Sequence, residues 1–352
     1  MSREHGMAAL RLEMTERVPR TEYSLEMHWD VIRAVTGLNV NADSPYEEKA
    51  YAQRLFFKIF NYDLAWSTEV DRRYLGKYCT DMGHGVYEAG GRDYRLAKEP
   101  VFKDVEEVFS FDPATQLPPI DEKRMVEIFN ASYDSQCARY EDAVTMTGTY
   151  ITCMSGLIDM LGWEMLLLAA GTDGEKFGEF ANRYAQWMQP FFNALAECKA
   201  PVIMVHDDIV WTSGPFLHTK WYREYVFPNY KKLFAPVIEA GKKLLFTSDG
   251  NYTEFIDDIA AAGAHGFVLE PCTDMEYIAK KYGKTHVFIG NADTRVLLHG
   301  TKEDIYNEVL RCMRIGKNCP GYFMAVGNHI PPNTPVENVL WYEECYEKLS
   351  RR

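Results

Sequence analysis

Short apolar runs alternate with amphipathic stretches along the second half of the chain. The runs that favour β-strands are 145–151, 201–206, 243–248, 266–270, 286–290 and 322–326. The stretches with helical periodicity are 173–197, 219–239, 252–262, 274–281, 302–317 and 335–349. Strands that alternate with helices are typical of βα units around a parallel sheet. At this length the pattern predicts an α/β fold that closes into a (β/α)8 TIM barrel, with an open doubly wound sheet as the alternative.

The first third of the chain has a different pattern. Residues 1–19 are predicted to form a helix that ends before Pro19, and residues 45–61 an amphipathic helix. Residues 62–120 are irregular and aromatic, with a short strand candidate at 85–87. No Ser/Gly-rich linker interrupts the chain, so we expect one domain over 1–352. It would be a barrel with an N-terminal helical extension and an insertion at 62–120, which is a lid or a partner-docking surface.

Polar residues follow five of the predicted strands. These strand ends read His206-Asp207-Asp208, Asp249-Gly250-Asn251, Glu270-Pro271-Cys272, Gly290-Asn291-Ala292-Asp293 and Gly327-Asn328-His329. Each has an ordinary structural explanation: an aspartate can cap the next helix, and a glycine can permit a tight turn. However, the carboxyl ends of barrel strands converge on one mouth, where active sites lie. The convergence of these polar residues on one mouth favours a functional site over separate capping and turn roles.

Two kinds of chemistry suit these side chains. Carboxylate, imidazole and thiolate are ligands for a divalent metal, and the best set is Glu270, Cys272 and His329, with Asp249 as a fourth candidate. Without a metal, His206 or His329 is a candidate general acid that Asp207 or Asp249 would orient. Asn291 and Asp293 would then hold substrate hydroxyls.

Composition and charge limit the classes of partner and the compartment that we expect for the protein. The net charge is -13, from 38 basic and 51 acidic residues, which argues against binding a nucleic-acid backbone. No apolar run is long enough to predict a membrane span. The eight cysteines contain no CxxC pair, so we expect reduced thiols and a cytoplasmic protein. Neither GxGxxG after a first strand nor GxxxxGK[ST] occurs, so dinucleotide and P-loop chemistry are not supported.

Three segments carry a family pattern. They are the opening MAALRLEMTERVPR, the central HDDIVWTSGPFLHTKWYREYVFPNYKK and the ending GNHIPPNTPVENVLWY. Over roughly residues 5–350 the chain resembles the uroporphyrinogen decarboxylase superfamily, and the ending is the most specific match. The resemblance implies a (β/α)8 barrel with its site at the C-terminal mouth.

The superfamily has two functional branches, and the chain departs from both. The zinc-dependent methyltransferases have His-x-Cys-Gly at the strand that reads LLFTSDG here, and a second cysteine near the end. This chain has Thr247, Asp249 and Asn328 at those positions. The decarboxylases use several N-terminal arginines to hold substrate carboxylates, whereas residues 21–32 contain Glu22, Glu26 and Asp30 and no arginine. An acidic mouth disfavours a polyanionic substrate.

The resemblance therefore implies a demethylating methyltransferase of anaerobic one-carbon metabolism, an O-demethylase component. It would move a methyl group from a small methylated donor, best an aryl methyl ether, to cobalamin carried by a corrinoid-binding protein. A zinc ion in the site and a homodimer are further expectations. Aromatic and methionine side chains would form the substrate wall, although core packing is the more common reason for such residues: Trp29, Trp66, Tyr150, Met154, Trp211, Phe216 and Phe323. The alternative is a decarboxylase-like lyase that acts on a tetrapyrrole or another carboxylated small molecule.

Overall fold

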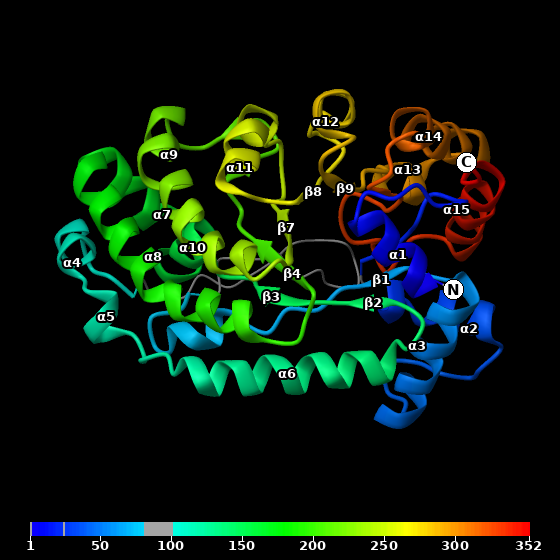
Figure 1. Ribbon diagram of the computed structural model, residues 1–352, viewed down its shortest axis with the longest axis horizontal. Coiled ribbons are helices and arrows are strands. Elements are labelled where there is room, and N and C mark those ends of the chain that lie inside the picture. Colours follow the sequence, from blue (N-terminus) through cyan, green and yellow to red (C-terminus); the bar gives the residue numbers. More distant parts are fainter. Residues whose placement is uncertain (1, 24, 81–100) are drawn as a thin grey trace.

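Parallel strands with helices packed around them form the centre of the protein in a computed structural model (Figure 1). The structure describes residues 2–23, 25–80 and 101–352. Six strands form one parallel sheet in the order β10-β9-β8-β7-β4-β3. They are β3 (Thr147–Thr149), β4 (Val202–His206), β7 (Lys243–Thr247), β8 (Gly266–Val268), β9 (Val287–Ile289) and β10 (Tyr322–Phe323). A second parallel pair consists of β1 (Leu64–Ala65) and β2 (Val144–Thr145).

Single backbone hydrogen bonds connect the two edges of this sheet. Met324 N donates to Pro19 O (2.8 Å), and Thr21 N donates to Met324 O (3.1 Å). Asp63 N donates to Arg20 O (2.9 Å), and β1 then pairs with β2, which leads directly into β3. The ring of eight segments therefore closes, but partly through single bonds rather than full ladders. This arrangement confirms the predicted (β/α)8 barrel.

Helices surround the strands (Figure 1), and the segment after the N-terminal helix meets the C-terminal helix, where Arg17 donates to the Tyr346 hydroxyl (2.7 Å). The helices that follow barrel strands are α7 (Cys153–Thr172), α8 (Gly174–Glu197), α9 (Thr219–Tyr225), α10 (Phe227–Glu239), α11 (Ile256–Ala262), α12 (Met275–Tyr282), α13 (Thr294–His299), α14 (Lys302–Gly316) and α15 (Val336–Leu349). The earlier ones are α1 (Ser2–Leu10), α2 (Trp29–Thr36), α3 (Tyr46–Phe60), α4 (Val105–Ser110), α5 (Pro113–Gln116) and α6 (Glu122–Arg139). Short 3-10 turns occur at η1 (Leu25–Met27), η2 (Arg72–Leu75) and η3 (Thr253–Phe255), and β5 (Val210–Trp211) and β6 (Gly214–Pro215) form a small hairpin.

The sequence patterns predict most elements after residue 143 and fewer before it. The expected helix at 1–19 ends at Leu10, because residues 18–21 bond to neighbouring strands instead. The expected helix at 219–239 divides at Val226, two residues before Pro228. Residues 62–120 contain β1, η2, α4 and α5, and the strand candidate at 85–87 lies outside the described residues.

Helix α7 was not predicted because it lacks the periodicity of an amphipathic helix. It is long and apolar enough to cross a membrane, but 72% of its most apolar window is buried inside the protein. A helix that is apolar on all sides is expected where neighbours cover it completely. We therefore assign α7 to the core.

Two apolar layers result from the alternation of side chains along the strands. One layer fills the barrel interior and includes Val202, Met204, Leu245 and Val268. The other layer packs the strands against the helices and includes Ile203, Val205, Leu244 and Phe246. Alternate residues of each strand therefore face the barrel axis, and this alternation decides which polar residues reach the mouth.

Candidate functional site

The inward-facing positions become polar where the strands end. Val202 and Met204 lie in the barrel interior, and two residues further along β4 the inward side chain is His206. The same step from Leu245 leads to Thr247 and then to Asp249. A cavity of about 50 Å³ lies at this level. Its lining consists of Tyr23, Tyr150, Met204, His206, Thr247, Ser248, Asp249, Val268, Gly327, Asn328 and His329.

Four polar side chains from two adjacent strands form the centre of the site. His206 lies opposite Thr247 in the β4–β7 register. Asp208 follows His206 by two residues, and Asp249 follows Thr247 by two residues. His206 Nε2 lies 3.5 Å from Asp208 Oδ1. One donor atom from each of His206, Asp208 and Asp249 lies within 4.8 Å of the other two. The strand register therefore places an imidazole and two carboxyls together.

Two serine hydroxyls hold the backbone of these residues. Asp208 N donates to Ser155 Oγ (2.7 Å), and Ile209 N donates to Ser248 Oγ (3.3 Å). Asp249 N also donates to Asp208 Oδ1 (3.0 Å), which fixes the two acids relative to each other. Gly250 follows with a positive φ of 83° and packs on the backbone of Trp211, so this turn requires glycine. The acids are thus held on ordered backbone.

Crowding by protein atoms alters the protonation of this cluster. Burial raises the pKa of Asp208 to about 7, and the charges of Asp207 and Glu270 add to the effect. Asp249 opens to solvent at the cavity mouth but is closely surrounded, and burial together with the Asp208 charge raises its pKa to about 7. Burial lowers the pKa of His206, against the opposite pull of Asp249 and Asp207. Neighbouring carboxyls that resist joint ionisation are common at functional sites.

Aromatic rings enclose one side of the cluster. The Tyr150 ring stacks on His206, with centroids 4.1 Å apart and an angle of 9° between the planes. Tyr23 packs on Trp66 at 4.5 Å and approaches His329 edge-on at 6.5 Å. The Tyr23 hydroxyl is buried and has no hydrogen-bond partner among the described residues. Burial raises the pKa of Tyr23, so the hydroxyl keeps its proton.

The three predicted catalytic residues do not all face the cavity. His206 and Asp249 reach the cavity, whereas Asp207 faces the surrounding helices. The Asp207 carboxylate accepts hydrogen bonds from Ser155 N (2.5 Å) and from the Tyr230 hydroxyl. Asp208 occupies the inward position next to His206. Strand alternation counted from Met204 would have identified Asp208, because 204, 206 and 208 share one face.

The three predicted metal ligands have different environments. Cys272 Sγ lies 3.7 Å from Glu270 Oε2, and burial raises the pKa of Cys272 to about 11, which disfavours the thiolate. Glu270 accepts hydrogen bonds from Gly250 N (3.0 Å) and from the Asn328 side chain. His329 lies across the cavity beside Tyr23. Within the described ranges, the group with donor atoms close enough to share one ion is His206, Asp208 and Asp249.

Among the residues predicted to bind substrate, Tyr150 lines the cavity. Met154 is fully buried in the core, and Trp29 packs at the edge of that core. Trp211 is 44% exposed and packs with Trp163 and Phe216.

The two remaining predicted substrate ligands have partners within the protein. The Asn291 amide donates to Glu270 O (3.2 Å) and accepts from Arg311 (3.0 Å). Asp293 caps α13 and pairs with Arg295. Asp274 likewise caps α12, whereas the structure shows no cap bond from Asp249. The strand-end aspartates therefore differ in role: Asp274 and Asp293 cap helices, whereas Asp249 does not.

The acidic residues near the N-terminus lie away from the cavity lining. Glu22 is buried and accepts hydrogen bonds from the Tyr342 hydroxyl (2.6 Å) and Val326 N (3.0 Å). Asp30 pairs with Arg33 on the surface. The negative charge of the mouth therefore comes from Asp208, Asp249 and Glu270. None of the described side chains that line the cavity is an arginine or a lysine.

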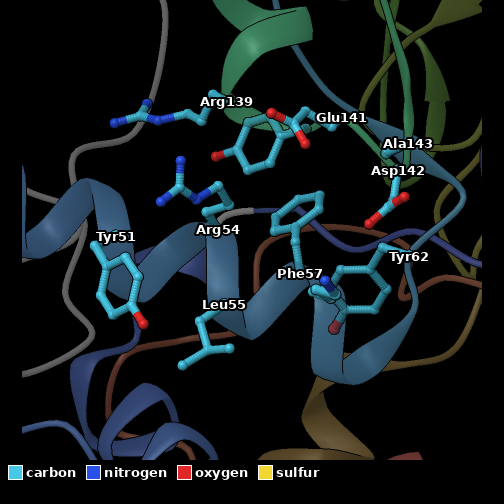
Figure 2. Close-up of a pocket in the computed structure, with 11 residues that line it drawn as sticks. Tyr51, Arg54, Leu55, Phe57, Tyr62, Arg139, Glu141, Asp142 and Ala143 are labelled. Carbon is cyan, nitrogen blue, oxygen red and sulfur yellow. The ribbon is translucent and has the colours of Figure 1, made fainter.

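A larger cavity of about 250 Å³ lies between α3 and the turn after α6 (Figure 2). Its floor is aromatic, with Phe57 and Tyr140 4.2 Å apart, and Arg54 and Arg139 lie at its rim. Tyr62 of its lining lies two residues before β1, and Ala143 directly precedes β2, so the cavity lies at the opposite end of the barrel. That end normally contributes stability rather than catalysis. The smaller cavity at the strand ends is the better candidate for the active site.

These features, a parallel barrel with ionisable groups at its C-terminal mouth, define an enzyme fold. The uroporphyrinogen decarboxylase (URO-D) family pattern matches residues 80–349, and the chain belongs to this family. Its members include decarboxylases and methyltransferases, so the chain is of an enzyme family.

Curated relatives match over part of the chain. A uroporphyrinogen decarboxylase from Syntrophotalea carbinolica is 29% identical over 161 residues, which is 46% of this chain and 45% of the relative. One from Coxiella burnetii is 24% identical over 231 residues, which is 59% of this chain and 62% of the relative. The chain thus spans about half the length of the first of these relatives and under two thirds of the second.

A solved methyltransferase from Methanosarcina mazei has a similar fold along nearly the whole chain. The TM-score is 0.65 at 18% identity, and the match covers 99% of this chain and 98% of that one. At this identity the likeness establishes the fold alone.

The positions where the zinc-dependent branch has its ligands meet at the cavity. Thr247, Asp249 and Asn328 all line it. A hydroxyl, a carboxyl and an amide replace the imidazole and the two thiolates expected there. These residues do not fit a thiolate zinc site.

Proposed function

We propose that the protein is the methyltransferase of a corrinoid-dependent demethylation system, with a small methylated oxygen compound as donor, best an aryl methyl ether. The observation that carries the proposal is the charge of the mouth. An imidazole and carboxyls surround the cavity, and its described lining offers no cationic side chain to pair with substrate carboxylates. Such a surface disfavours a polyanionic tetrapyrrole and suits a neutral donor.

The size of the cavity supports a small reacting group. A volume of about 50 Å³ has room for a few water-sized groups. A methoxy group fits such a space, with the rest of the donor in the open mouth. Tyr150 and Tyr23 would pack against it, and the unpartnered Tyr23 hydroxyl would donate a hydrogen bond to the ether oxygen.

The reaction would transfer the methyl group to a corrinoid protein as co-substrate. The bond between the methyl carbon and the donor oxygen breaks, and a bond between that carbon and cobalt forms. Cobalt changes formally from Co(I) to Co(III), and the departing oxygen takes one proton to leave as a phenol. Stabilisation of that oxygen is the contribution required from the protein. The corrinoid protein is a proposed partner.

The test combines reduced corrinoid protein with a panel of methoxyarenes and follows the absorbance of the methylated corrinoid. We expect methyl transfer from at least one donor. Tyr23→Phe should lower kcat/KM by about 2–10-fold, the effect of one hydrogen bond. Tyr277→Phe, which alters a surface tyrosine bonded to Asp257, is the matched control and should change nothing.

Decarboxylation is the second candidate, because a curated decarboxylase is 29% identical to the chain over 161 residues. The same protein is therefore incubated with uroporphyrinogen, and carbon dioxide release is measured. Release of carbon dioxide, together with no methyl transfer across the panel, would replace the proposal with the decarboxylase alternative.

A further inference from the structure

The His206, Asp208 and Asp249 side chains have the geometry of a ligand set. The distance between His206 Nε2 and Asp208 Oδ1 is 3.5 Å. Two donors on one tetrahedral ion, each at about 2.0–2.1 Å from it, lie roughly 3.3 Å apart. Asp249 completes a group whose three donor atoms lie within 4.8 Å of one another. Small side-chain adjustments would therefore bring all three donors onto one ion.

Thr247 gives a second, independent indication of a bound ligand. This residue is 7% exposed and lines the same cavity. Its hydroxyl oxygen is buried and has no hydrogen-bond partner among the described residues. Buried polar atoms are normally paired, and an exception calls for an unseen water, ion or substrate. A water bound to an ion in front of His206 would reach this hydroxyl, because the two residues are paired across β4 and β7.

The carboxyls around the cluster would also favour a bound cation. Asp208 and Asp249 lie close together, and Glu270, Asp207 and Asp159 add negative charge nearby. No lysine or arginine is among the described residues that line the cavity. A divalent ion is often the largest local charge in such a site and would compensate the carboxylates.

We propose that His206, Asp208 and Asp249 bind one divalent transition-metal ion at the barrel mouth. The imidazole nitrogen favours zinc, copper, iron or nickel over calcium and magnesium, which prefer oxygen ligands alone. Three protein ligands leave open positions for water or a substrate oxygen. The ligand set shares only Asp249 with the positions of the thiolate pattern, and it contains none of Glu270, Cys272 and His329.

This inference concerns metal binding alone and does not require the proposed methyl transfer. The protein is stripped with a chelator and dialysed against Zn²⁺ or Co²⁺, and the bound metal is measured by elemental analysis. The absorption spectrum of the Co²⁺ form reports nitrogen and oxygen ligands without a thiolate band. No methyl donor or corrinoid is present, so a failure of metal binding and a failure of methyl transfer remain distinguishable.

Variants identify the ligands. Asp208→Asn and Asp249→Asn should each lower metal affinity more than about 100-fold, beyond the effect of losing an outer partner. Glu270→Gln and Cys272→Ser are matched controls close to the cluster and should retain one ion per chain. Because His206 is buried, His206→Gln is accompanied by circular dichroism to verify folding.

Two results would overturn the proposal. One is the absence of a stoichiometric ion in the wild-type protein. The other is retention of the ion in both aspartate variants, including the case in which the Glu270 or Cys272 variant loses it. One ion per chain that depends on Asp208 and Asp249 supports the proposal, whatever the outcome of the methyl-transfer assay.

Discussion

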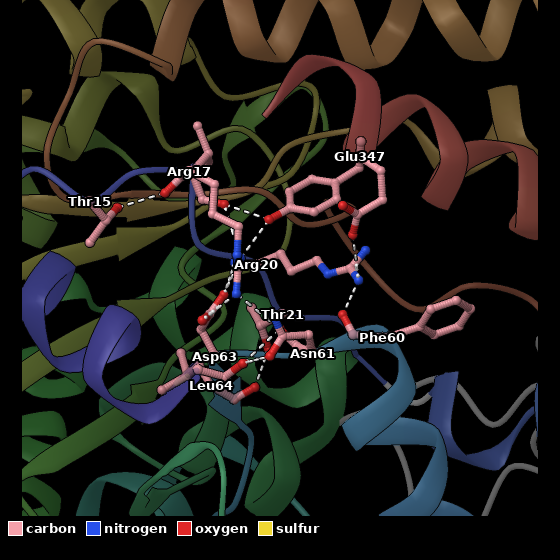
Figure 3. A network of polar contacts seen from close by, with 12 residues as sticks. Thr15, Arg17, Arg20, Thr21, Phe60, Asn61, Asp63, Leu64 and Glu347 are labelled. Atoms are coloured by element: carbon pink, nitrogen blue, oxygen red, sulfur yellow. Dashed lines mark hydrogen bonds and ion pairs between the residues drawn. The ribbon is translucent and has the colours of Figure 1, made fainter. Parts of the chain in front are cut away.

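Charged groups occur in two interior regions of this protein, and the two are built in opposite ways. Near the N-terminal segment, cations and anions are paired (Figure 3). Arg20 bonds to Glu343 and lies over the Tyr346 ring at 4.3 Å, and Arg17 bonds to Asp63 at 2.7 and 2.8 Å. At the barrel mouth, two carboxyls lie beside the His206 imidazole, and the described cavity lining contains no arginine or lysine. The first region pairs each carboxylate with a guanidinium group, whereas the second brings carboxyls together around one imidazole.

The paired region explains the Arg17-Val18-Pro19-Arg20 motif. The backbone of these residues connects β10 to β1 and closes the barrel. Their guanidinium groups extend away from the cavity, where Arg20 also bonds to Phe60 O and to Glu347 (3.2 Å). The motif that carries part of the family resemblance therefore has a structural role here.

Replacing Arg20 should produce the largest loss of stability. Arg20→Met keeps apolar volume but leaves Glu343 buried without its cation, and breaking such a pair costs about 3–5 kcal/mol. The free energy of unfolding from urea titration measures this effect. Arg33→Ala removes an exposed pair with Asp30 and should cost at most about 0.5 kcal/mol. If both variants lose equally little, the interior pairing has no structural importance.

Glu22 combines features of the two regions. It is buried close to the Arg20 pairs, but its hydrogen-bond partners are the Tyr342 hydroxyl and Val326 N rather than a basic side chain. Burial raises its pKa to about 8, against the hydrogen bonds from Tyr342 and Val326 N. The folded state therefore holds a proton that the unfolded chain releases near pH 4.5. By linkage, the stabilisation from this group is complete below about pH 4.5 and is lost as pH rises through about 8.

Glu22→Gln should remove that dependence. Relative to the variant, the wild-type free energy of unfolding is expected to fall by roughly 2–4 kcal/mol between pH 5 and pH 9. The difference between the two proteins isolates Glu22 from other titrating groups. Parallel curves across this range would show that Glu22 is ionised throughout and behaves like the paired acids.

Sequence patterns predicted the barrel because its strands from 145 to 326 are apolar runs separated by helices. They did not predict the two segments that close the barrel, since residues 18–21 and 63–65 contribute only single bonds or a two-residue strand. Local periodicity cannot detect so short a segment. The helix at 1–19 was overextended for the same reason.

The candidate site could be predicted as a place but not residue by residue. Composition alone could not separate Asp207 from Asp208, although strand alternation places only Asp208 beside His206. The aspartates at strand ends also differ: Asp274 and Asp293 cap helices, while Asp249 faces the cavity. That difference depends on where the next helix begins, which the sequence leaves uncertain by several residues. Tyr23 was missed because its segment did not resemble a strand.

The smallest expected change in the free energy of unfolding is a gain in stability, whereas the preceding changes are losses. Asp208→Asn keeps the shape and still accepts the hydrogen bond from Asp249 N, but it removes one of two like charges. In the presence of a chelator at pH 8, we expect the variant to gain about 0.5–1 kcal/mol in unfolding free energy, since close like charges destabilise a fold. Asp134→Asn, whose surface carboxylate pairs with Lys199 at 2.6 Å, is the control and should gain nothing. A loss of stability in Asp208→Asn would mean that the charge is satisfied within the protein, as it is around Arg20, and that the mouth has no need of a cation.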